Sequence, residues 1–322
     1  MVANPTALSF YGIGKEATPG TYAVPTDFLP LTKMTPVDKT MWLKDDGMRG
    51  SMAKEYNLIA GPVWSELTCD GPVFPDSIGY PLMSFLGDLT VTGASAPFSH
   101  VGALKNSGTA QPVSDSLTDF DSVDSRGYPG LQWYDLTFKW DGEKLLTWAG
   151  TAKGFQSAVQ TKPTASYTTV TALPGWLCIP TINSIVGTTL IDGEIKMKRG
   201  GGPIHTADGT QAPYQMFVGD AEVSGKLVVV ADTSTQLTNY LAGTKVPVDI
   251  NFTQGAGAAL VQFKLHMTLC NLNEVKPARG KEWTEYEIDF TALPNTTDAG
   301  ASGGLSHIKA TLQNAKPSGT FV

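Results

Sequence analysis

Residues 261–269 read Val-Gln-Phe-Lys-Leu-His-Met-Thr-Leu, a strict alternation of apolar and polar side chains. Successive side chains of a β-strand point to opposite faces of a sheet, so this stretch predicts a strand with one buried face. The same alternation recurs at 134–140, 191–198, 246–252, 286–290 and 308–312. Antiparallel sheets covered on one face carry this pattern, whereas strands of parallel sheets are apolar throughout. The chain is therefore expected to be all-β, a mainly antiparallel barrel or sandwich.

Two short stretches favour flanking α-helices instead, at 76–86 and 234–242. The first begins at Asp76 and stops at Gly87, and the second begins at Ser234 and stops at Gly243. These residue types are the usual helix caps. Pro81 fits the first helix only within its first turn, or if the helix begins later. Each expected helix follows a strand and ends at a glycine, which raises the hypothesis of an internal duplication.

The expected elements divide the chain into five segments. They are an N-terminal strand region (1–31), an extended loop or arm (32–62), a first β half (63–160), a seam rich in Thr and Ser (161–171) and a second β half (172–322). The arm combines charged residues with Trp42 and shows little alternation. A long loop of this kind inside a compact domain is usually functional or disordered.

Composition narrows the classes of function. Charged residues make up 16% of the 322 residues, against about a quarter in typical soluble domains. A surface poor in charge suits a subunit that meets other subunits, although many monomers are equally uncharged. The net charge of −7 argues against tight binding of DNA and permits a surface that repels it.

The sequence lacks the patterns of catalytic and metal sites. The four histidines have no ligand spacing, and Cys69, Cys178 and Cys270 lie far apart, which favours reduced thiols over a disulfide framework or a zinc site. Residues 119–124, Asp-Phe-Asp-Ser-Val-Asp, lack the glycine and distant glutamate of a calcium loop, so a solvated loop is favoured. No signal-peptide pattern is visible, and no apolar run approaches ~20 residues. We expect no enzyme activity, cofactor, metal or membrane association.

Several short motifs follow one another along most of the chain. They are Gly-Ile-Gly-Lys-Glu (12–16), Pro-Gly-Thr (19–21), Val-Pro-Thr-Asp-Phe-Leu-Pro (24–30), Gly-Pro-Val-Phe-Pro-Asp (71–76), Phe-Leu-Gly (85–87), Gly-Tyr-Pro-Gly (127–130), Leu-Thr-Phe (136–138), Leu-Leu-Thr-Trp (145–148), Asp-Gly-Glu-Ile (192–195), Lys-Arg (198–199), Gly-Thr-Gln (209–211), Gly219 and the strand 223–230. In this order they resemble the tail tube (major tail) proteins of long non-contractile-tailed bacteriophages.

The resemblance implies a virion protein, assembled in the host cytoplasm, whose copies form a ring, and rings that stack into a hollow tube conducting DNA during ejection. A six-fold ring is expected, or three chains if each carries two equivalent halves. Tape measure and tail terminator proteins would be partners, and double-stranded DNA would pass transiently. A neck or tail-completion ring is the alternative within phage tails.

Two other classes of protein stay open. A carbohydrate-binding β-sandwich adhesin would need exposed aromatic side chains, for which Trp133, Trp140, Trp148 and Trp176 are candidates. The other is a β-rich hydrolase, which would need converging polar groups that the sequence does not show.

Two sets of residues are candidate sites for the tube function. Contacts between rings are expected in the arm, at Met41, Trp42, Lys44, Met48, Arg49 and Lys54. A basic channel would hold DNA, so the lumen is expected to be acidic or neutral. Carboxylates on polar strand faces are the candidates for its lining: Asp192, Glu194, Asp249, Glu287 and Asp289. The sequence does not say which polar faces turn inward.

Overall fold

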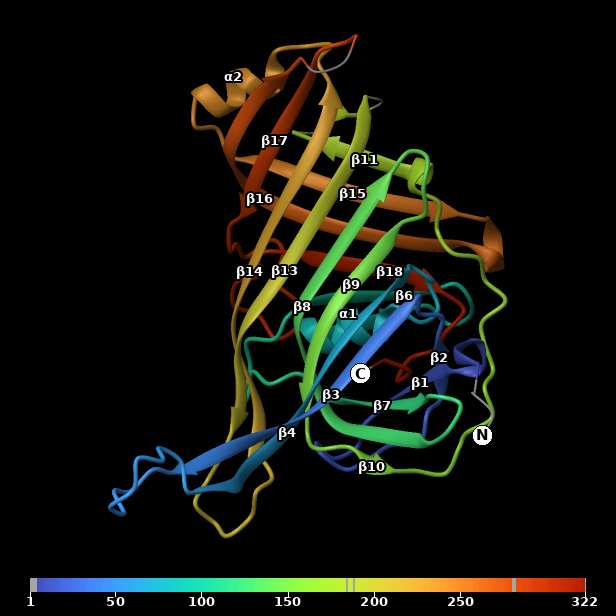
Figure 1. Ribbon diagram of the computed structural model, residues 1–322. Coiled ribbons are helices and arrows are strands. Elements are labelled where there is room, and N and C mark those ends of the chain that lie inside the picture. Colours follow the sequence, from blue (N-terminus) through green and yellow to red (C-terminus); the bar gives the residue numbers. More distant parts are fainter. Residues whose placement is uncertain (1–4, 184, 188, 280–281, 322) are drawn as a thin grey trace.

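The computed structural model in Figure 1 describes residues 5–321 apart from 184, 188, 280 and 281. Two helices, α1 (Gly79–Leu86) and α2 (Thr235–Leu241), and 3₁₀ turns at Thr6–Leu8, Gly175–Leu177 and Gly257–Ala259 accompany the strands. The strands are β1 (Phe10–Lys15), β2 (Asp27–Leu29), β3 (Lys33–Asp45), β4 (Asn57–Pro72), β5 (Gly87–Thr92), β6 (Phe98–Leu104), β7 (Asp115–Phe120), β8 (Ser125–Asp141), β9 (Thr147–Gly154), β10 (Ala158–Val159), β11 (Cys178–Ile182), β12 (Ile185–Val186), β13 (Leu190–Ile204), β14 (Gln215–Val230), β15 (Val246–Gln254), β16 (Val261–Ala278), β17 (Glu285–Ala292) and β18 (Lys309–Asn314). No helix in the described part of the chain is long and apolar enough to cross a membrane.

The strands pair antiparallel and form a sandwich of two layers (Figure 1). The front layer runs in the order β3–β4–β9–β8–β13–β14–β17–β16. The back layer contains β11, β15, the first half of β16, β18, β6 and β5. The expected fold class is confirmed: the protein is all-β with two short helices, and its sheet stays open rather than closing into a barrel.

The core lies between the layers and follows the predicted alternation. Leu136, Phe138 and Trp140 of β8 are buried, whereas Lys139 between them is exposed. The ring of Phe138 lies 4.9 Å from that of Phe263 on β16, and this contact joins the two layers. The buried member of each alternating pair thus fixes which face of its strand turns inward.

The pairing scheme of the first half of the chain recurs in the second. The pairs β1–β2, β1–β7, β7–β8, β8–β10, β8–β9, β9–β4 and β4–β3 correspond to β11–β12, β11–β15, β15–β16, β16–β18, β16–β17, β17–β14 and β14–β13. In each half the helix follows the second strand of the long hairpin, β4 or β14. The β5–β6 hairpin has no counterpart among the described residues.

Three register shifts in the ladders of the first half also have counterparts in the second, whereas the shift at Leu190/Asp192 has none among the described residues. The shift at Thr40/Trp42 in β3 corresponds to the one at Arg199/Gly201 in β13. The shifts at Asp115/Leu117 and Trp133/Asp135 correspond to those at Val246/Val248 and Leu272/Glu274. Bulges are conserved within protein families. Because they occur at equivalent positions in both halves, the chain contains two copies of one structural unit.

Both helices lie where the sequence predicts them, with shorter bounds. α1 begins at Gly79, so Pro81 falls in the first turn, where an N–H has no intrahelical partner. Gly87 ends α1 in the left-handed conformation with φ of 85°. Asp76 is not the N-cap; its carboxylate accepts a hydrogen bond from Thr168 Oγ1 at 2.8 Å.

The expectation of a long loop at 32–62 is wrong, because most of this segment forms β-strands. β3 and β4 pair as a two-stranded hairpin that extends beyond the sandwich, and residues 46–56 form its tip (Figure 1). A ribbon exposed on both faces needs no alternation of apolar and polar residues, which is why its strands did not stand out in the sequence. The other proposed segment boundaries stay predictions.

A buried carboxylate organises the N-terminal part of the fold. Glu16, only 3% exposed, accepts hydrogen bonds from the backbone N–H groups of Gly20 (2.8 Å) and Gly130 (2.6 Å). The hydroxyls of Ser114 and Ser116 donate to the same carboxylate, each at 2.6 Å. One side chain therefore ties β1, β7 and β8 to the segment after β1.

Replacing Glu16 with Ala should lower the free energy of unfolding by about 3 kcal/mol or more, because four buried donors lose their acceptor. Chemical denaturation would measure the loss. Glu16→Gln keeps one acceptor oxygen and should fall between the wild type and Glu16→Ala. Equal stability of the Ala variant and the wild type would contradict this role.

Asp115 is a second buried carboxyl group. It is 0% exposed, and Trp133 Nε1 donates to its Oδ2 at 3.1 Å. Burial raises the pKa of Asp115 well above its ordinary value, the hydrogen bond from Trp133 opposes this, and the charge of Glu16 adds to it. Because an acid with a raised pKa binds its proton more tightly in the folded state, stability is lost as pH rises above the pKa of the unfolded chain.

Asp115→Asn should therefore flatten the pH dependence of stability and raise the melting temperature at pH 8 more than at pH 5. Melting curves of both proteins across this range would test the effect. An unchanged or steeper fall in stability of the variant with rising pH would contradict it.

Candidate assembly surfaces

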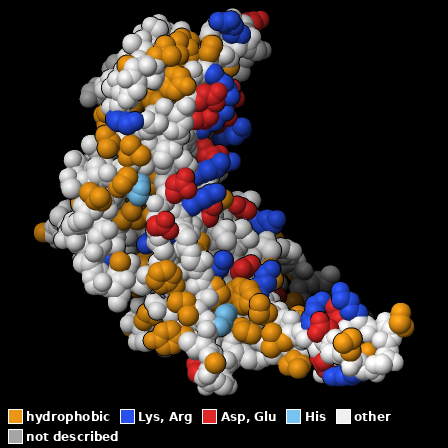
Figure 2. All heavy atoms as spheres, turned by 90° about the vertical axis from the view of Figure 1, so that its left-hand side faces the viewer, with side chains coloured by type: hydrophobic (Ala, Val, Ile, Leu, Met, Phe, Trp, Pro, Cys, Tyr) orange, Lys and Arg blue, Asp and Glu red, His pale blue; other side chains and the backbone are white. Residues whose placement is uncertain are grey.

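The outer face of the front layer carries alternating acidic and basic side chains, which form a column along one side of the molecule (Figure 2). The strand register produces the column: Glu194 of β13 lies opposite Lys139 of β8 and Lys226 of β14. Lys226 lies opposite Asp289 of β17, and Asp289 lies opposite Glu274 of β16. We call this surface the charged face.

Ion pairs between neighbouring strands connect the charged face. Lys139 Nζ lies 2.8 Å from Glu194 Oε2, and Lys226 Nζ lies 2.8 Å from Glu287 Oε2. Burial raises the pKa of Glu194, but hydrogen bonds from Lys139 and Lys196 outweigh it and hold the pKa below its ordinary value. The hydrogen bond from Lys226 lowers the pKa of Glu287. These carboxylates are therefore ionised at neutral pH, and lysines balance much of their charge.

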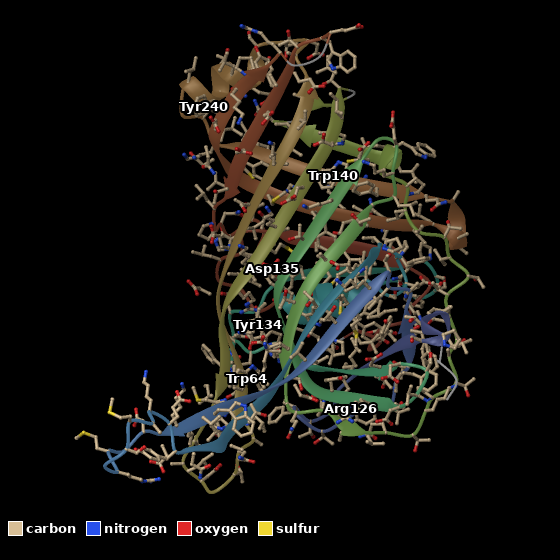
Figure 3. The ribbon with its side chains drawn as sticks, in the orientation of Figure 1. Trp64, Arg126, Tyr134, Asp135, Trp140 and Tyr240 are labelled. Atoms are coloured by element: carbon tan, nitrogen blue, oxygen red, sulfur yellow. The ribbon has the colours of Figure 1, made fainter. Side chains whose placement is uncertain are left out.

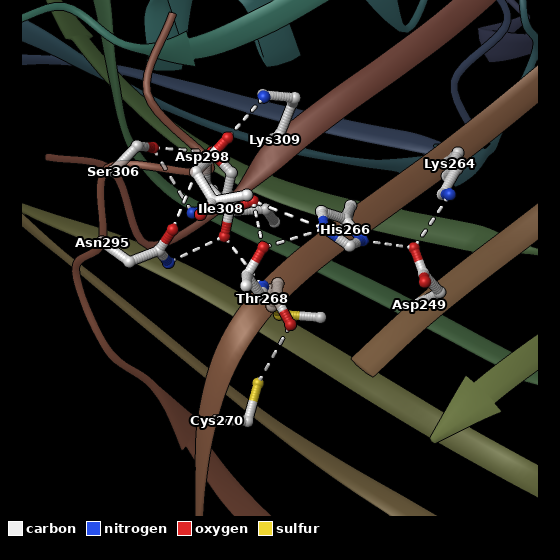
Figure 4. Close-up of polar contacts among 12 residues, drawn as sticks. Asp249, Lys264, His266, Thr268, Cys270, Asn295, Asp298, Ser306, Ile308 and Lys309 are labelled. Atoms are coloured by element: carbon white, nitrogen blue, oxygen red, sulfur yellow. Dashed lines mark hydrogen bonds and ion pairs between the residues drawn. The ribbon is translucent and has the colours of Figure 1, made fainter. Parts of the chain in front are cut away.

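Four of the five candidate lumen residues belong to the charged face: Asp192, Glu194, Glu287 and Asp289. Asp249 does not. It lies on β15 in the back layer, where its Oδ1 contacts His266 Nδ1 at 2.6 Å and Lys264 Nζ at 2.9 Å (Figure 4). Although burial raises the pKa of Asp249, hydrogen bonds from His266 and Lys264 lower it below the ordinary value.

In the network around Asp249, hydrogen bonds connect an acid to a histidine and the histidine to a hydroxyl. Catalytic triads have the same arrangement. His266 Nε2 lies 2.9 Å from Thr268 Oγ1, but that hydroxyl donates to Asp298 Oδ1 at 2.8 Å. Asp298 is 0% exposed and also accepts from Asn295 Nδ2 at 2.9 Å. The hydroxyl of Thr268 thus donates to a buried carboxylate, and the network fastens the loop after β17 to β16 (Figure 4).

No cluster that could hold a metal ion occurs among residues 5–321 that the structure describes. In the candidate calcium loop at 119–124, the first two residues end β7 and residues 121–124 form the turn to β8. Asp121 Oδ1 accepts the backbone N–H groups of Val123 (2.9 Å) and Asp124 (2.8 Å). These contacts lower the pKa of Asp121, as in an ordinary turn closed by an aspartate.

The aromatic residues considered for sugar binding do not form a surface cluster. Trp133, Trp140 and Trp148 are at most 5% exposed, and only Trp176 of the four is open to solvent, at 69%. Trp140 points into the core against Phe252, whereas Asp135 on the same strand belongs to the charged face (Figure 3). Trp133, Trp140 and Trp148 stabilise the sandwich core.

The outer part of the β3–β4 hairpin, with its tip, carries apolar side chains that are exposed to solvent. Met41 and Trp42 are more than half exposed, and Met48 and Met52 are fully exposed. Lys44 pairs with Glu55 and Arg49 with Asp45 inside the hairpin, and Lys54 is exposed. The six candidate contact residues thus lie together on one projecting element (Figure 1).

The hairpin is supported at its base by the β13–β14 hairpin. Val63 N–H donates to the carbonyl of Gln211 at 2.9 Å, and Gln211 Nε2 donates to the carbonyl of Ala60 at 2.8 Å. The ring of Trp64 lies 5.8 Å from that of His205 (Trp64 in Figure 3). The two long hairpins of the repeated units therefore project side by side.

Sequence patterns did not reveal two open strand edges of the front layer. β3 pairs with β4 alone, and residues 271–278 of β16 pair with β17 alone, among the described residues. Open edges expose unpaired backbone N–H and C=O groups and invite another strand. Alternation shows a strand's faces but not its neighbours, so only the pairing scheme exposes them.

A family of known proteins matches the sequence of this chain. No curated protein matches the chain. The model of the family described as phage tail tube protein matches residues 6–312, which is nearly the whole chain and both of its repeated units. The chain therefore belongs to the phage tail tube protein family.

Proposed function

We propose that this protein is the repeating subunit of a phage tail tube, in which copies close into rings, rings stack, and the charged face lines a channel for double-stranded DNA. Membership of the family makes it a structural component of the virion tail. The charged face is the observation that carries the proposal, because it is one continuous polar surface over strands whose other side is the core.

A conduit for DNA must not bind it. A channel of lysines and arginines would neutralise phosphates and hold the duplex. On the charged face, carboxylates and lysines pair across strands, so the surface is hydrophilic without being basic. Asp192, Glu194, Glu287 and Asp289 are the lining residues in this proposal, and Asp249 is left out because it lies in the other layer.

The projecting β3–β4 hairpin supplies the contact between rings. Met41, Trp42 and Met48 would be the apolar anchors, and Lys44, Arg49 and Lys54 would form a polar rim around them. A hairpin that leaves the body of its own subunit buries these side chains only against another molecule. The next ring along the tube is the partner that a stacked assembly provides.

The remaining partners follow from this role. The ring contains six chains, or three chains that together supply six similar β units. Tape measure and tail terminator proteins would meet the tube along its bore and at its end, and assembly would take place in the host cytoplasm. A neck or tail-completion ring would share the fold but would not polymerise.

Negative-stain microscopy of the purified chain at increasing concentration tests the proposal. Rings that stack into hollow tubes of variable length are expected. Single rings that never stack would favour the neck component. A protein that stays monomeric at every concentration, or rings with five or seven equivalent units, would contradict the proposed function.

A further inference from the structure

We propose that the tip of the β3–β4 hairpin is a site of reversible methionine oxidation, and that Met48 and Met52 have to be in the thioether form for rings to stack. The inference rests on the proposed function, since it takes this hairpin as the contact between rings. It adds a chemical condition to that contact: a peroxide that converts both side chains to sulfoxides in the free subunit stops the growth of tubes.

The methionines fall into two groups by their exposure to solvent. Eight of the nine lie among the described residues. Met48 and Met52 are fully exposed, and Met41 is 53% exposed. The other five are at most 9% exposed: Met34, Met83, Met197, Met216 and Met267. Every exposed thioether in the described part of the chain therefore lies on one projecting hairpin.

The cysteines do not compete for a mild oxidant. Cys69 and Cys270 are 0% exposed. Burial raises the pKa of Cys178 to about 12, so its thiol stays protonated at neutral pH. Cysteine oxidation follows exposure and thiolate character, and these three thiols have little of either. The exposed methionines are the sulfur atoms that a peroxide reaches first.

The tip holds its charged side chains by contacts of its own but leaves its methionines outside. Arg49 pairs with Asp45, and its guanidinium carbon lies 4.8 Å from the centre of the Tyr56 ring. The sulfur atoms drawn at the end of the hairpin in Figure 3 point away from the molecule. Because Met48 and Met52 bury no surface in the free subunit, their apolar groups contribute energy only in a contact with another molecule.

The oxidation and its reversal are simple two-electron steps. The lone pair of the thioether sulfur attacks one oxygen of hydrogen peroxide, an S–O bond forms, the O–O bond breaks, and the peroxide is reduced to water. The sulfoxide is polar, whereas the thioether is apolar. Methionine sulfoxide reductases reverse the step. They break the S–O bond and release the oxygen as water, and two thiols of the reductant supply the electrons and become a disulfide.

A sulfoxide opposes the contact between rings. Methionine suits an apolar anchor because its flexible side chain fits irregular surfaces. A sulfoxide oxygen that is buried in the same place loses its water and needs a hydrogen-bond donor in return. Lys44 and Arg49 of the hairpin already pair with Glu55 and Asp45. The oxidised tip therefore weakens stacking, while the fold of the subunit is unchanged because the tip meets no core.

Stacking would also protect the methionines. The next ring covers the tip in the proposed tube, so peroxide reaches Met48 and Met52 in free subunits and at a growing end but not inside a finished tube. The free subunit is the sensitive state, and reduction of its sulfoxides makes it competent again.

Peroxide treatment of the full chain, kept too dilute to assemble, tests the inference. Peptide mass spectrometry should show one added oxygen each on Met48 and Met52, at least about tenfold faster than on the buried Met83 and Met267, which serve as internal controls. After removal of the peroxide and concentration, tube mass should fall at least about tenfold while rings remain. Both methionine sulfoxide reductases, one for each sulfoxide epimer, with dithiothreitol should restore the tubes.

Two double variants separate this site from damage elsewhere. Met48→Leu with Met52→Leu keeps apolar anchors without an oxidisable sulfur, so its tubes should form equally well before and after peroxide. Met48→Gln with Met52→Gln carries polar side chains of similar length and should lose tubes without any peroxide. Circular dichroism would confirm that both variants are folded.

The outcomes are distinct. Normal tubes from wild-type protein that carries both sulfoxides would overturn the inference, as would an equal loss of tubes in the wild type and the leucine variant. Oxidation of Met48 and Met52 in preformed tubes as fast as in free subunits would also overturn it. The first two results leave the tube function standing. Failure of the untreated protein to form rings or tubes would overturn the tube function itself.

Discussion

Replacing residues 46–56 with a two-residue Asn-Gly turn is expected to leave a folded chain that forms rings but almost no tubes, with a drop in tube mass of at least about a hundredfold. The ladder between β3 and β4 reaches Asp45 and Asn57, and Asn-Gly is a favoured hairpin turn, so the shortened hairpin keeps its pairing. The deletion removes Met48 and Met52, whose side chains are fully exposed in the isolated chain. Apolar anchors of this kind dominate the energy of an interface.

Microscopy would count tubes, and circular dichroism would confirm that the shortened chain is folded. Val123→Ser is the matched control: Val123 is 73% exposed but lies in the turn between β7 and β8, away from the hairpin. The control should form tubes as the wild type does. Tubes of normal number and length from the shortened chain would rule out the hairpin as the contact between rings.

Replacing acidic residues of the charged face with lysine should give tubes that bind duplex DNA, whereas wild-type tubes should bind it only weakly. Glu194→Lys with Asp289→Lys adds four positive charges to each chain, repeated in every ring. The affinity of assembled tubes for duplex DNA at low salt should rise by about a thousandfold or more and fall steeply as salt is added. Sedimentation of labelled DNA with tubes at several salt concentrations would measure it.

The control for this experiment exchanges an ion pair instead of changing the net charge. Glu194→Lys with Lys139→Glu reverses a pair whose atoms lie 2.8 Å apart and leaves the sum of charges unchanged. Its tubes should bind DNA no better than those of the wild type. Equal retention of DNA by wild-type and charge-reversed tubes would show that this face does not line the channel.

The parts of the fold that obey local rules could be predicted from the sequence. Strands with one covered face, such as β8 and β15, follow the alternation, because each apolar side chain meets the core. The two helices carry glycine stops, and Gly87 adopts the conformation that a helix end requires. The two halves show little similarity in amino-acid sequence. In the structure, their strand pairing and the positions of their bulges show the duplication.

The remaining features depend on neighbours distant in the sequence. The sequence predicts a loop where β3 and the start of β4 form a hairpin, because the projecting part of this hairpin meets no core and shows little alternation. Alternation placed Asp249 and Glu194 on polar faces equally well, but only the topology shows that these faces belong to opposite layers. The sequence around Glu16 does not indicate that its side chain is buried, because three of its four donors lie about a hundred residues further along the chain.

The most direct test of the central claim is an electron cryo-microscopy reconstruction of the assembled protein. We predict closed rings in which Lys139, Glu194 and Glu287 face a bore wide enough for a DNA duplex and the β3–β4 hairpins contact the adjacent ring. A ring with the charged face on its outer surface, or a bore lined mainly by lysine and arginine, would contradict the account.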